Sequence, residues 1–182
     1  MAKLAFIGTG VMGAPMAGHL AAAGHDVTVY NRTQAKALAW ADKYGGGIAD
    51  TPAAAAKDAD AVFACVGNDD DLASVTLGED GAFAAMRDDA VFVDHTTVSA
   101  SIARRLAGER ALVVDAPVSG GQAGAENGKL SIMCGGSTEA MAKAEPFMQA
   151  YAALIVHVGD AGAGQTTKMC NQIAIAGVIL GV

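Results

Sequence analysis

The stretch Lys3-Leu-Ala-Phe-Ile-Gly-Thr-Gly-Val-Met-Gly-Ala-Pro-Met-Ala-Gly-His-Leu-Ala-Ala-Ala-Gly-His25 decides the fold of this chain. Residues 4–7 are a short apolar run that predicts a buried strand, and residues 14–23 are mostly small residues that predict a helix. A second strand is expected at residues 26–30. The order strand, glycine turn, helix, strand is typical of a parallel α/β sheet.

Three glycines between the first strand and the helix have G-x-G-x-x-G spacing. Gly8 permits the sharp exit from the strand, Gly10 lets backbone N–H groups approach a pyrophosphate, and Gly13 lets the helix pack close to the strand. The positive end of the helix then faces the phosphates, and Gly24 ends the helix. An ordinary glycine turn can have the same spacing, but the position between strand and helix favours a dinucleotide-binding turn.

The composition predicts one tightly packed domain with a short extension. Of the 182 residues, 52% are hydrophobic and only 17% are charged. The net charge of −7 argues against a nucleic-acid or anionic-membrane partner, since both require a basic surface. Cys65, Cys134 and Cys170 lack C-x-x-C spacing and lie in apolar or helical contexts, so we expect buried thiols in a reducing cytoplasm and no metal site.

Strand and helix signals alternate along the rest of the chain. Further strands are expected at residues 45–48, 61–66, 90–93, 111–115, 130–134 and 153–157, and helices at 34–44, 52–57, 69–75, 82–86, 99–107 and from 159–164 onwards. Thr51 and Ser99 are the expected N-caps of two of these helices. The alternation predicts a doubly wound, mostly parallel α/β sheet of Rossmann type, whose ligands bind at the carboxyl ends of the strands.

The end of the second strand discriminates between the two nicotinamide cofactors. An NAD site usually has an Asp or Glu here, which accepts hydrogen bonds from the ribose hydroxyls and repels the extra phosphate of NADP. This chain has Asn31, Arg32 and Thr33 instead. Because a guanidinium can pair with a 2′-phosphate, these residues favour NADP over NAD. The alternative is that Arg32 is an ordinary solvated residue at the start of a helix.

Two later segments have residues suited to substrate binding and proton transfer. Residues 115–121, Asp-Ala-Pro-Val-Ser-Gly-Gly, end in a turn whose hydroxyl and N–H groups can hold a carboxylate, although a tight turn without a ligand uses the same residues. Lys168 and Asn171 lie three residues apart, on one face of the last helix. Since that helix is otherwise uncharged, its single ammonium favours a functional role over a solvated surface charge.

Three motifs together resemble a known family. Residues 8–16 (Gly-Thr-Gly-Val-Met-Gly-Ala-Pro-Met), 115–121 and 162–171 (Gly-Ala-Gly-Gln-Thr-Thr-Lys-Met-Cys-Asn) are similar, in order and spacing, to the signatures of the β-hydroxyacid dehydrogenases. The resemblance implies hydride transfer between NADP(H), with NAD possible, and a small β-hydroxy acid or its semialdehyde. Such substrates include 3-hydroxyisobutyrate, tartronate semialdehyde and succinic semialdehyde.

The resemblance also implies roles for individual residues. Lys168 would be the catalytic residue. The residues that would hold the substrate are Ser119, Gly120, Gly121 and Asn171. The residues that would line the cofactor site are Gly8, Thr9, Gly10, Val11, Met12, Gly13, Asn31, Arg32, Thr33, Val66, Gly67, Asn68 and Thr97. One departure is the pair Val66-Gly67, which replaces the Leu-Pro common in the family.

The chemistry implied needs one group that manages a proton while the cofactor carries the hydride. In reduction the Lys168 ammonium would polarise the carbonyl and deliver the proton; in oxidation the neutral amine would accept it, which requires burial to lower its pKa. His95 and His157 are rivals, since imidazole suits proton transfer near neutral pH. Of the two, His157 is expected to be structural, and His95 is expected near the cofactor.

Three other interpretations stay open. A 6-phosphogluconate dehydrogenase has similar motifs but needs further cations for the substrate phosphate, and none cluster after Gly121. An imine reductase shares the fold but replaces the catalytic lysine. A non-catalytic dinucleotide-binding module also loses the lysine and has basic companions, whereas this chain is acidic.

The end of the chain bears on domain organisation and assembly. We expect a dinucleotide-binding domain at residues 1–163, and at 164–182 the start of a long helix that leads into an all-α C-terminal domain absent from this chain. Residues 173–182 are apolar on nearly all faces, which a soluble domain tolerates only if another domain or subunit covers them. A homodimer or homotetramer formed through the C-terminal helical region is therefore expected.

Overall fold

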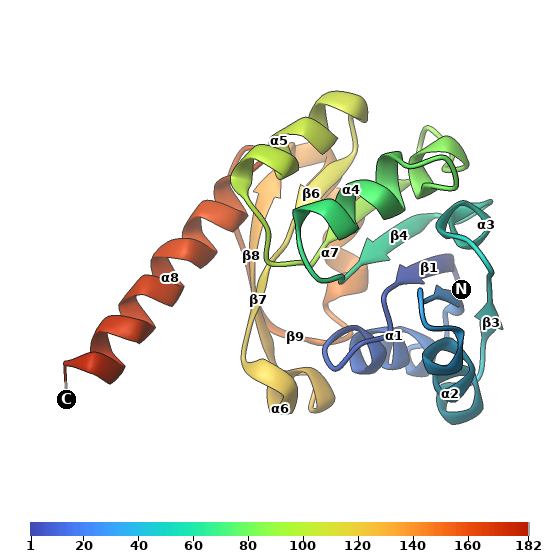
Figure 1. The fold of residues 1–182 in the computed structure, drawn as a ribbon, viewed down its shortest axis with the longest axis horizontal. Coiled ribbons are helices and arrows are strands. Elements are labelled where there is room, and N and C mark those ends of the chain that lie inside the picture. Colours follow the sequence, from blue (N-terminus) through green and yellow to red (C-terminus); the bar gives the residue numbers. More distant parts are fainter. Residues whose placement is uncertain (182) are drawn as a thin grey trace.

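The computed structural model describes residues 1–181 and has one twisted sheet with helices on both faces (Figure 1). Its strands are β1 (Lys3–Ile7), β2 (Asp26–Tyr30), β3 (Gly47–Ile48), β4 (Ala61–Ala64), β5 (Val91–Asp94), β6 (Val113–Asp115), β7 (Val118–Ser119), β8 (Leu130–Gly136) and β9 (Ala152–Gly159). The strand order is β3-β2-β1-β4-β5-β6-β8-β7, and β9 also pairs with β8. The chain thus winds outward from β1 in both directions, which places a topological switch point between β1 and β4.

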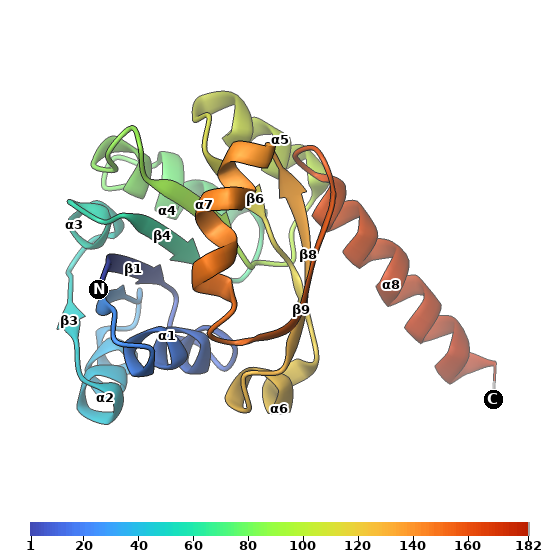
Figure 2. The same ribbon diagram turned by 180° about the vertical axis from the view of Figure 1, so that it is seen from behind.

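The helices divide between the two faces of the sheet (Figure 2). They are α1 (Gly13–Ala22), α2 (Gln34–Tyr44), α3 (Pro52–Ala56), α4 (Asp69–Leu77), the short 3₁₀ helix η1 (Ala82–Ala84), α5 (Ala100–Glu109), α6 (Gly121–Glu126), α7 (Thr138–Met148) and α8 (Ala163–Leu180). One buried cluster joins the sheet to α1, α2, α6 and α7, and the other joins it to α3, α4, η1 and α5. The central strands β1, β4, β5 and β6 are therefore buried almost throughout, as their nearly continuous apolar sequences require, whereas β9 is largely exposed.

The strand directions confirm a mostly parallel sheet of Rossmann type. From β3 through β6 all neighbouring strands pair in parallel, with Ile7 beside Tyr30 on one side and Ala64 on the other. The strand β8 is antiparallel to both β6 and β7, and β9 is parallel to β8. Three elements, β7, α6 and α7, were not expected from the sequence, and β4 ends at Ala64, two residues earlier than predicted.

Local signals explain where several helices begin and end. The Thr51 hydroxyl accepts the N–H of Ala54 at 3.0 Å, and Pro52 occupies the first helical position, where its missing N–H costs nothing. The Ser99 hydroxyl likewise caps α5. Both predicted caps are confirmed.

The last helix, α8, leads away from the body of the protein (Figure 1). Its first turns pack on β8 and α5, but its later apolar side chains are exposed, Ile173 to 73% and Ile179 to 71%. Among the described residues, no helix combines the length and the hydropathy that crossing a bilayer requires.

Candidate functional site

Two cavities join at the carboxyl edge of the sheet, at the end of β4. The outer cavity, of about 300 Å³, is lined by Ile7, Gly8, Gly10, Tyr30, Asn31, Arg32, Thr33, Lys36, Cys65, Val66, Gly67, Asp71, Ser74 and Val75. The inner cavity, of about 500 Å³, is lined by Met12, Cys65, Val66, Gly67, His95, Thr96, Thr97, Val118, Ser119, Gly120, Gly121, Lys168, Gln172 and Ile175. Because residues 65–67 line both, the two cavities form one groove across the switch point.

The three glycines of the turn have two different surroundings: Gly8 and Gly13 are closely packed, and Gly10 is open. Gly8 has a φ of +97°, and a Cβ there would collide with the carbonyl oxygen of Cys65. A Cβ at Gly13 would collide with the carbonyl oxygen of Gly8, so the close approach of helix and strand requires glycine. A Cβ at Gly10 would meet no atom within 4 Å. Gly10 therefore faces the groove, and its backbone is open to a ligand.

Asn31 links the end of β2 to this turn. Its Oδ1 accepts the N–H of Thr9 at 3.0 Å, and its Nδ2 donates to the carbonyl oxygen of Thr33 at 3.0 Å. The side chain of Asn31 thus holds the turn in place. The hydroxyl of Thr9 is buried and has no hydrogen-bond partner among the described residues, which leaves one polar atom in the turn for a ligand to satisfy.

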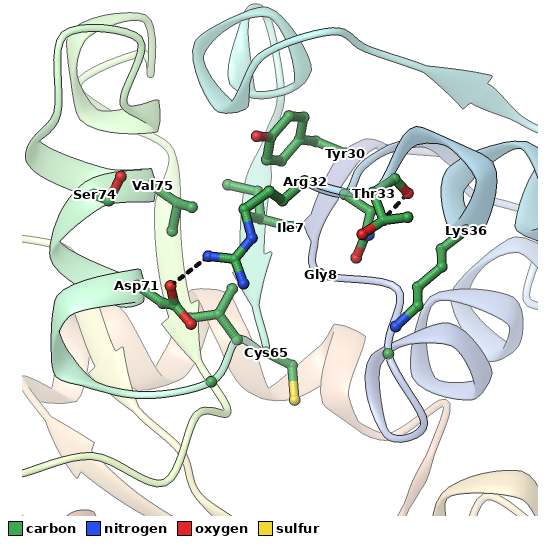
Figure 3. A pocket seen from close by; sticks show the side chains of 14 residues that line it. Ile7, Gly8, Tyr30, Arg32, Thr33, Lys36, Cys65, Asp71, Ser74 and Val75 are labelled. Atoms are coloured by element: carbon green, nitrogen blue, oxygen red, sulfur yellow. Dashed lines mark hydrogen bonds and ion pairs between the residues drawn. The ribbon is translucent and has the colours of Figure 1, made fainter.

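Charged side chains from two walls meet in the outer cavity (Figure 3). Arg32, which follows β2, places Nη1 2.8 Å from Oδ1 of Asp71 in the first turn of α4. The side chain of Arg32 is 82% exposed and that of Asp71 28%. Lys36 from α2 and Thr33 line the same cavity on the side of the glycine turn. Two cations and one carboxylate therefore surround this end of the groove.

Lys168 reaches the other end of the groove from the second turn of α8. Only 8% of this residue is exposed, and the loss of hydration lowers the pKa of its amine. No carboxylate among the described residues forms an ion pair with it. The turn that carries Ser119, Gly120 and Gly121 lines the same inner cavity. A buried amine without an acidic partner is poised to exchange a proton with a ligand.

A buried carboxylate fixes the start of the helix that carries this lysine. Asp115, at the end of β6, accepts the N–H of Gly162 on Oδ1 at 2.7 Å and the N–H of Gln165 on Oδ2 at 2.9 Å. The Gln165 side chain donates to the carbonyl oxygen of Thr96 at 2.7 Å and accepts the N–H of Val98 at 3.2 Å. The first turn of α8 is thereby bonded both to the sheet and to the loop after β5.

The two rival histidines are held by protein groups. His95 is buried, with Nδ1 2.7 Å from the carbonyl oxygen of Ala116 and Nε2 2.8 Å from the hydroxyl of Tyr151. Burial lowers the pKa of its ring to about 4, so the ring is neutral at pH 7. Nε2 of His157 lies 2.8 Å from the carbonyl oxygen of Gly136. Both rings have their hydrogen bonds within the protein.

A second buried carboxylate lies beside the first. Asp94 and Asp115 are register partners on the neighbouring strands β5 and β6. Burial raises the pKa of Asp94 to about 7. The N–H of Thr96, which donates to Oδ1 of Asp94, opposes this rise, and the charge of Asp115 adds to it. Its Oδ2 has no partner among the described residues. Within residues 1–181, no three His, Cys, Asp or Glu side chains gather as metal ligands would.

The structure brings most of the expected site residues together. Those outside both cavity linings are Thr9, Val11, Gly13, Asn68 and Asn171. The Asn68 side chain caps α4 through the N–H of Asp71, and Val11 is exposed. On α8, Gln172 lines the inner cavity in place of Asn171.

The polar residues that the sequence prediction missed include Lys36, Asp71, Asp115 and Gln165. Lys36 had a usable signal, since it lies one helical turn beyond Arg32 and Thr33. Asp115 also had one, because a carboxylate in an otherwise apolar strand requires hydrogen bonds. Gln165 and Asp71 had none, since each is brought to its partners by contacts distant in the sequence.

The residues present fit a dinucleotide. The open backbone at Gly10 and the unpartnered hydroxyl of Thr9 suit a pyrophosphate. Arg32, Thr33 and Lys36 suit the ribose and any phosphate on it. The inner cavity beyond residues 65–67 leaves room for the second nucleotide and a small substrate.

Comparisons with known proteins agree with this geometry. Residues 3–159 match the family model described as the NAD binding domain of 6-phosphogluconate dehydrogenase. An uncharacterized oxidoreductase of Shewanella frigidimarina is 56% identical over 100% of this chain and 64% of its own length. A 3-hydroxyisobutyrate dehydrogenase of Pseudomonas aeruginosa is 36% identical over 100% of this chain and 62% of its own.

A solved structure shows the same arrangement. A 3-hydroxyisobutyrate dehydrogenase of Mycobacterium tuberculosis, solved with L-serine, has a TM-score of 0.87 and 33% identity, covering 97% of this chain and 60% of its own. The chain thus spans less than two thirds of the length of these relatives. It belongs to the β-hydroxyacid dehydrogenase family and has the dinucleotide-binding fold of that family.

Proposed function

We propose, with membership of this family as the premise, that the chain is the dinucleotide-binding part of an oxidoreductase for small β-hydroxy acids or their semialdehydes. Its substrates would be compounds such as 3-hydroxyisobutyrate, tartronate semialdehyde or succinic semialdehyde. The observation that carries the proposal is the buried, unpaired amine of Lys168, which shares the inner cavity with the turn at Ser119. A bound nicotinamide would supply or accept the hydride.

The roles of the residues in the inner cavity follow from their chemistry. Ser119, Gly120 and Gly121 would bind the substrate carboxylate through a hydroxyl and backbone N–H groups. Lys168 would donate a proton to the carbonyl oxygen in reduction and take it from the hydroxyl in oxidation. A lowered pKa serves oxidation in particular, because only the neutral amine can accept a proton. Asn171 stays a proposed substrate ligand.

The charges of the cavity favour a substrate without phosphate. Among the described residues, Lys168 is the only Lys or Arg that lines the inner cavity. A phosphorylated sugar acid needs cations for both its carboxylate and its phosphate. A short acid with a single negative charge fits this cavity better than 6-phosphogluconate does.

For the cofactor, we propose NADP(H) in preference to NAD(H). Arg32, Thr33 and Lys36 line the outer cavity, and no Asp or Glu follows β2 directly. These residues can bind a 2′-phosphate that the ribose of NAD lacks.

The finer organisation also stays a proposal. We retain the division into residues 1–163 and 164–182, a homodimer or homotetramer formed through the C-terminal region, and a cytoplasmic location. The exposed Ile173 and Ile179 support assembly. The free cysteines support a reducing compartment, although the expectation that all three are buried is wrong: Cys134 is buried, Cys65 is partly buried, and Cys170 is exposed because it lies on the part of α8 that leaves the body of the protein. Sedimentation of the protein across concentrations tests the assembly, and a monomer throughout would contradict it.

Turnover measures the proposed activity directly. The oxidoreductase that contains this chain would be assayed for oxidation of NADPH with a panel of short semialdehydes and, as a competing class, imines. Reduction of NADP⁺ would be assayed in parallel with the matching β-hydroxy acids and with 6-phosphogluconate. Turnover of a semialdehyde, lost in Lys168→Ala, is expected. Preference for imines or for 6-phosphogluconate, or nucleotide binding by that oxidoreductase without turnover of any panel member, would overturn the proposal.

A further inference from the structure

We infer that Asp71 is a specificity-determining residue that weakens binding of the 2′-phosphate and so narrows the preference of the outer cavity for NADP over NAD. The inference deepens the proposed function and rests on it. Its basis is the ion pair in which the Asp71 carboxylate holds the guanidinium expected to meet the phosphate. The pair joins the two walls of the outer cavity, from the end of β2 to the start of α4 (Figure 3).

The carboxylate is directed into the cavity by its neighbours in α4. Three acidic residues in succession begin this helix. Asp69 is turned toward α5, where it accepts the N–H of Ser99 at 2.9 Å as well as the Ser99 hydroxyl. Asp70 is exposed and lines neither cavity. Of the three, Asp71 alone lines the outer cavity.

The loop between β4 and α4 makes room for this carboxylate. A Cβ placed on Gly67 would lie 2.5 Å from Oδ2 of Asp71, well inside van der Waals contact. Any larger residue at position 67 would push the carboxylate away or be pushed away by it. Gly67 and Asp71 therefore act as a matched pair, and the glycine permits the position from which Asp71 reaches Arg32.

The charge on the adenosine ribose of each cofactor decides how Asp71 affects its binding. The 2′-phosphate of NADP brings about two negative charges to this end of the cavity. Arg32 must then exchange or share its carboxylate partner, and Asp71 repels the phosphate from the opposite wall. The ribose hydroxyls of NAD carry no charge, so the ion pair can stay intact when NAD binds. Asp71 thus opposes the preference that Arg32 and Lys36 create.

The exchange is feasible because the pair is weakly held. It consists of one Nη1–Oδ1 contact, and the Arg32 side chain is 82% exposed, so little free energy is lost when the guanidinium moves. Asp71 therefore moderates the cofactor preference and leaves both cofactors able to bind.

Two nucleotides that differ only in the 2′-phosphate separate this effect from catalysis. Calorimetry would measure adenosine 2′,5′-bisphosphate and adenosine 5′-monophosphate binding to the protein and to Asp71→Asn. Removing the charge should strengthen the bisphosphate by about 5- to 30-fold and change the monophosphate less than about twofold. Asp71→Ala should show the same direction. Asp70→Asn, which removes an equal charge on the same helical turn outside the cavity, is the matched control.

The outcomes distinguish this inference from the proposed function. An unchanged ratio of the two affinities in Asp71→Asn, or an equal change in Asp70→Asn, would overturn the role of Asp71 alone. Failure of the parent protein to bind either nucleotide would overturn the proposed use of the cofactor and this inference together. Repeating the comparison with NADPH and NADH should give the same shift in ratio.

Discussion

The outer and inner cavities lie on one groove but are built in different ways. In the outer cavity, exposed charges at the ends of β2 and the start of α4 meet through a single ion pair. In the inner cavity, Lys168 rises from a helix whose first turn is bonded to Asp115 in the buried sheet. We infer that residues of the outer cavity, which select the cofactor, can be substituted at little cost to the stability of the fold. Residues of the inner cavity, where the proposed chemistry takes place, are tied to that stability.

The largest effect is expected at Lys168. Lys168→Ala should lower turnover by about 10²- to 10⁴-fold, the usual contribution of a positioned acid or base. Binding of NADPH should be nearly unchanged, because the outer cavity does not include this residue. Lys168→Arg should not restore turnover, since a guanidinium does not release its proton in this pH range. Steady-state kinetics and calorimetry measure the two quantities. Turnover within a few-fold of the parent would refute the assignment.

A substitution of Asp115 tests whether the inner cavity is tied to the stability of the fold. Asp115→Ala leaves the buried N–H groups of Gly162 and Gln165 without their acceptor. The free energy of unfolding should fall by about 2 to 4 kcal/mol, the cost of two unsatisfied buried donors. Urea unfolding of the variant measures this, with the exposed Asp70→Ala as control. A loss equal to that of the control would show that the helix start is not held in this way.

The neighbouring Asp94 makes the stability of the fold depend on pH. Its pKa is about 7 in the folded protein against an ordinary 3.8, so between these values the folded protein keeps a proton that the unfolded chain has released. Stability from this group therefore falls as the pH rises through that range. His95 acts in the opposite direction, because its folded pKa of about 4 lies below the ordinary 6.5. The two contributions oppose each other and mask one another in the parent protein.

Asp94→Asn should separate them. The stability of the variant relative to the parent should increase by about 2 to 4 kcal/mol as the pH rises from 4 to 7 and then level off. Urea midpoints of both proteins at several pH values measure the difference, in which groups that do not interact with Asp94 cancel; Asp115, which does interact with it, contributes to the measured change. A difference that stays constant with pH would contradict the raised pKa of Asp94.

Much of the fold was predictable because its signals are local. The glycine turn, the caps at Thr51 and Ser99 and the apolar strands are each read from a few neighbouring residues. The helix α7 was missed although Ser137 caps it, because Pro146 lies inside the helix and argues against one. The short strand β7 is too brief to have a periodic signal.

The site was predictable only in part because its contacts are distant in sequence. Arg32 and Asp71 lie 39 residues apart, and Asp115 and Gly162 lie 47 apart. Motifs identify the residues that face a ligand, such as Gly10 and Lys168. They do not identify the protein groups that hold those residues, which become visible once the strands are placed side by side.

The smallest effect is expected from substitution of Arg32, which tests the outer cavity. Arg32→Ala should weaken NADPH by about 10-fold and NADH less than about twofold, because only NADPH has a 2′-phosphate for the guanidinium. The folded stability should change by less than about 0.5 kcal/mol, since the ion pair with Asp71 is solvated. Calorimetry and urea unfolding on the same preparations check both quantities, with Lys36→Ala as the comparison for the second cation. In an Asp71→Asn background the same substitution should cost NADPH more, because the guanidinium there has no carboxylate to leave. Equal losses of affinity for NADPH and NADH would mean that Arg32 does not recognise the 2′-phosphate. A large loss of stability would mean that the outer cavity is as closely tied to folding as the inner cavity.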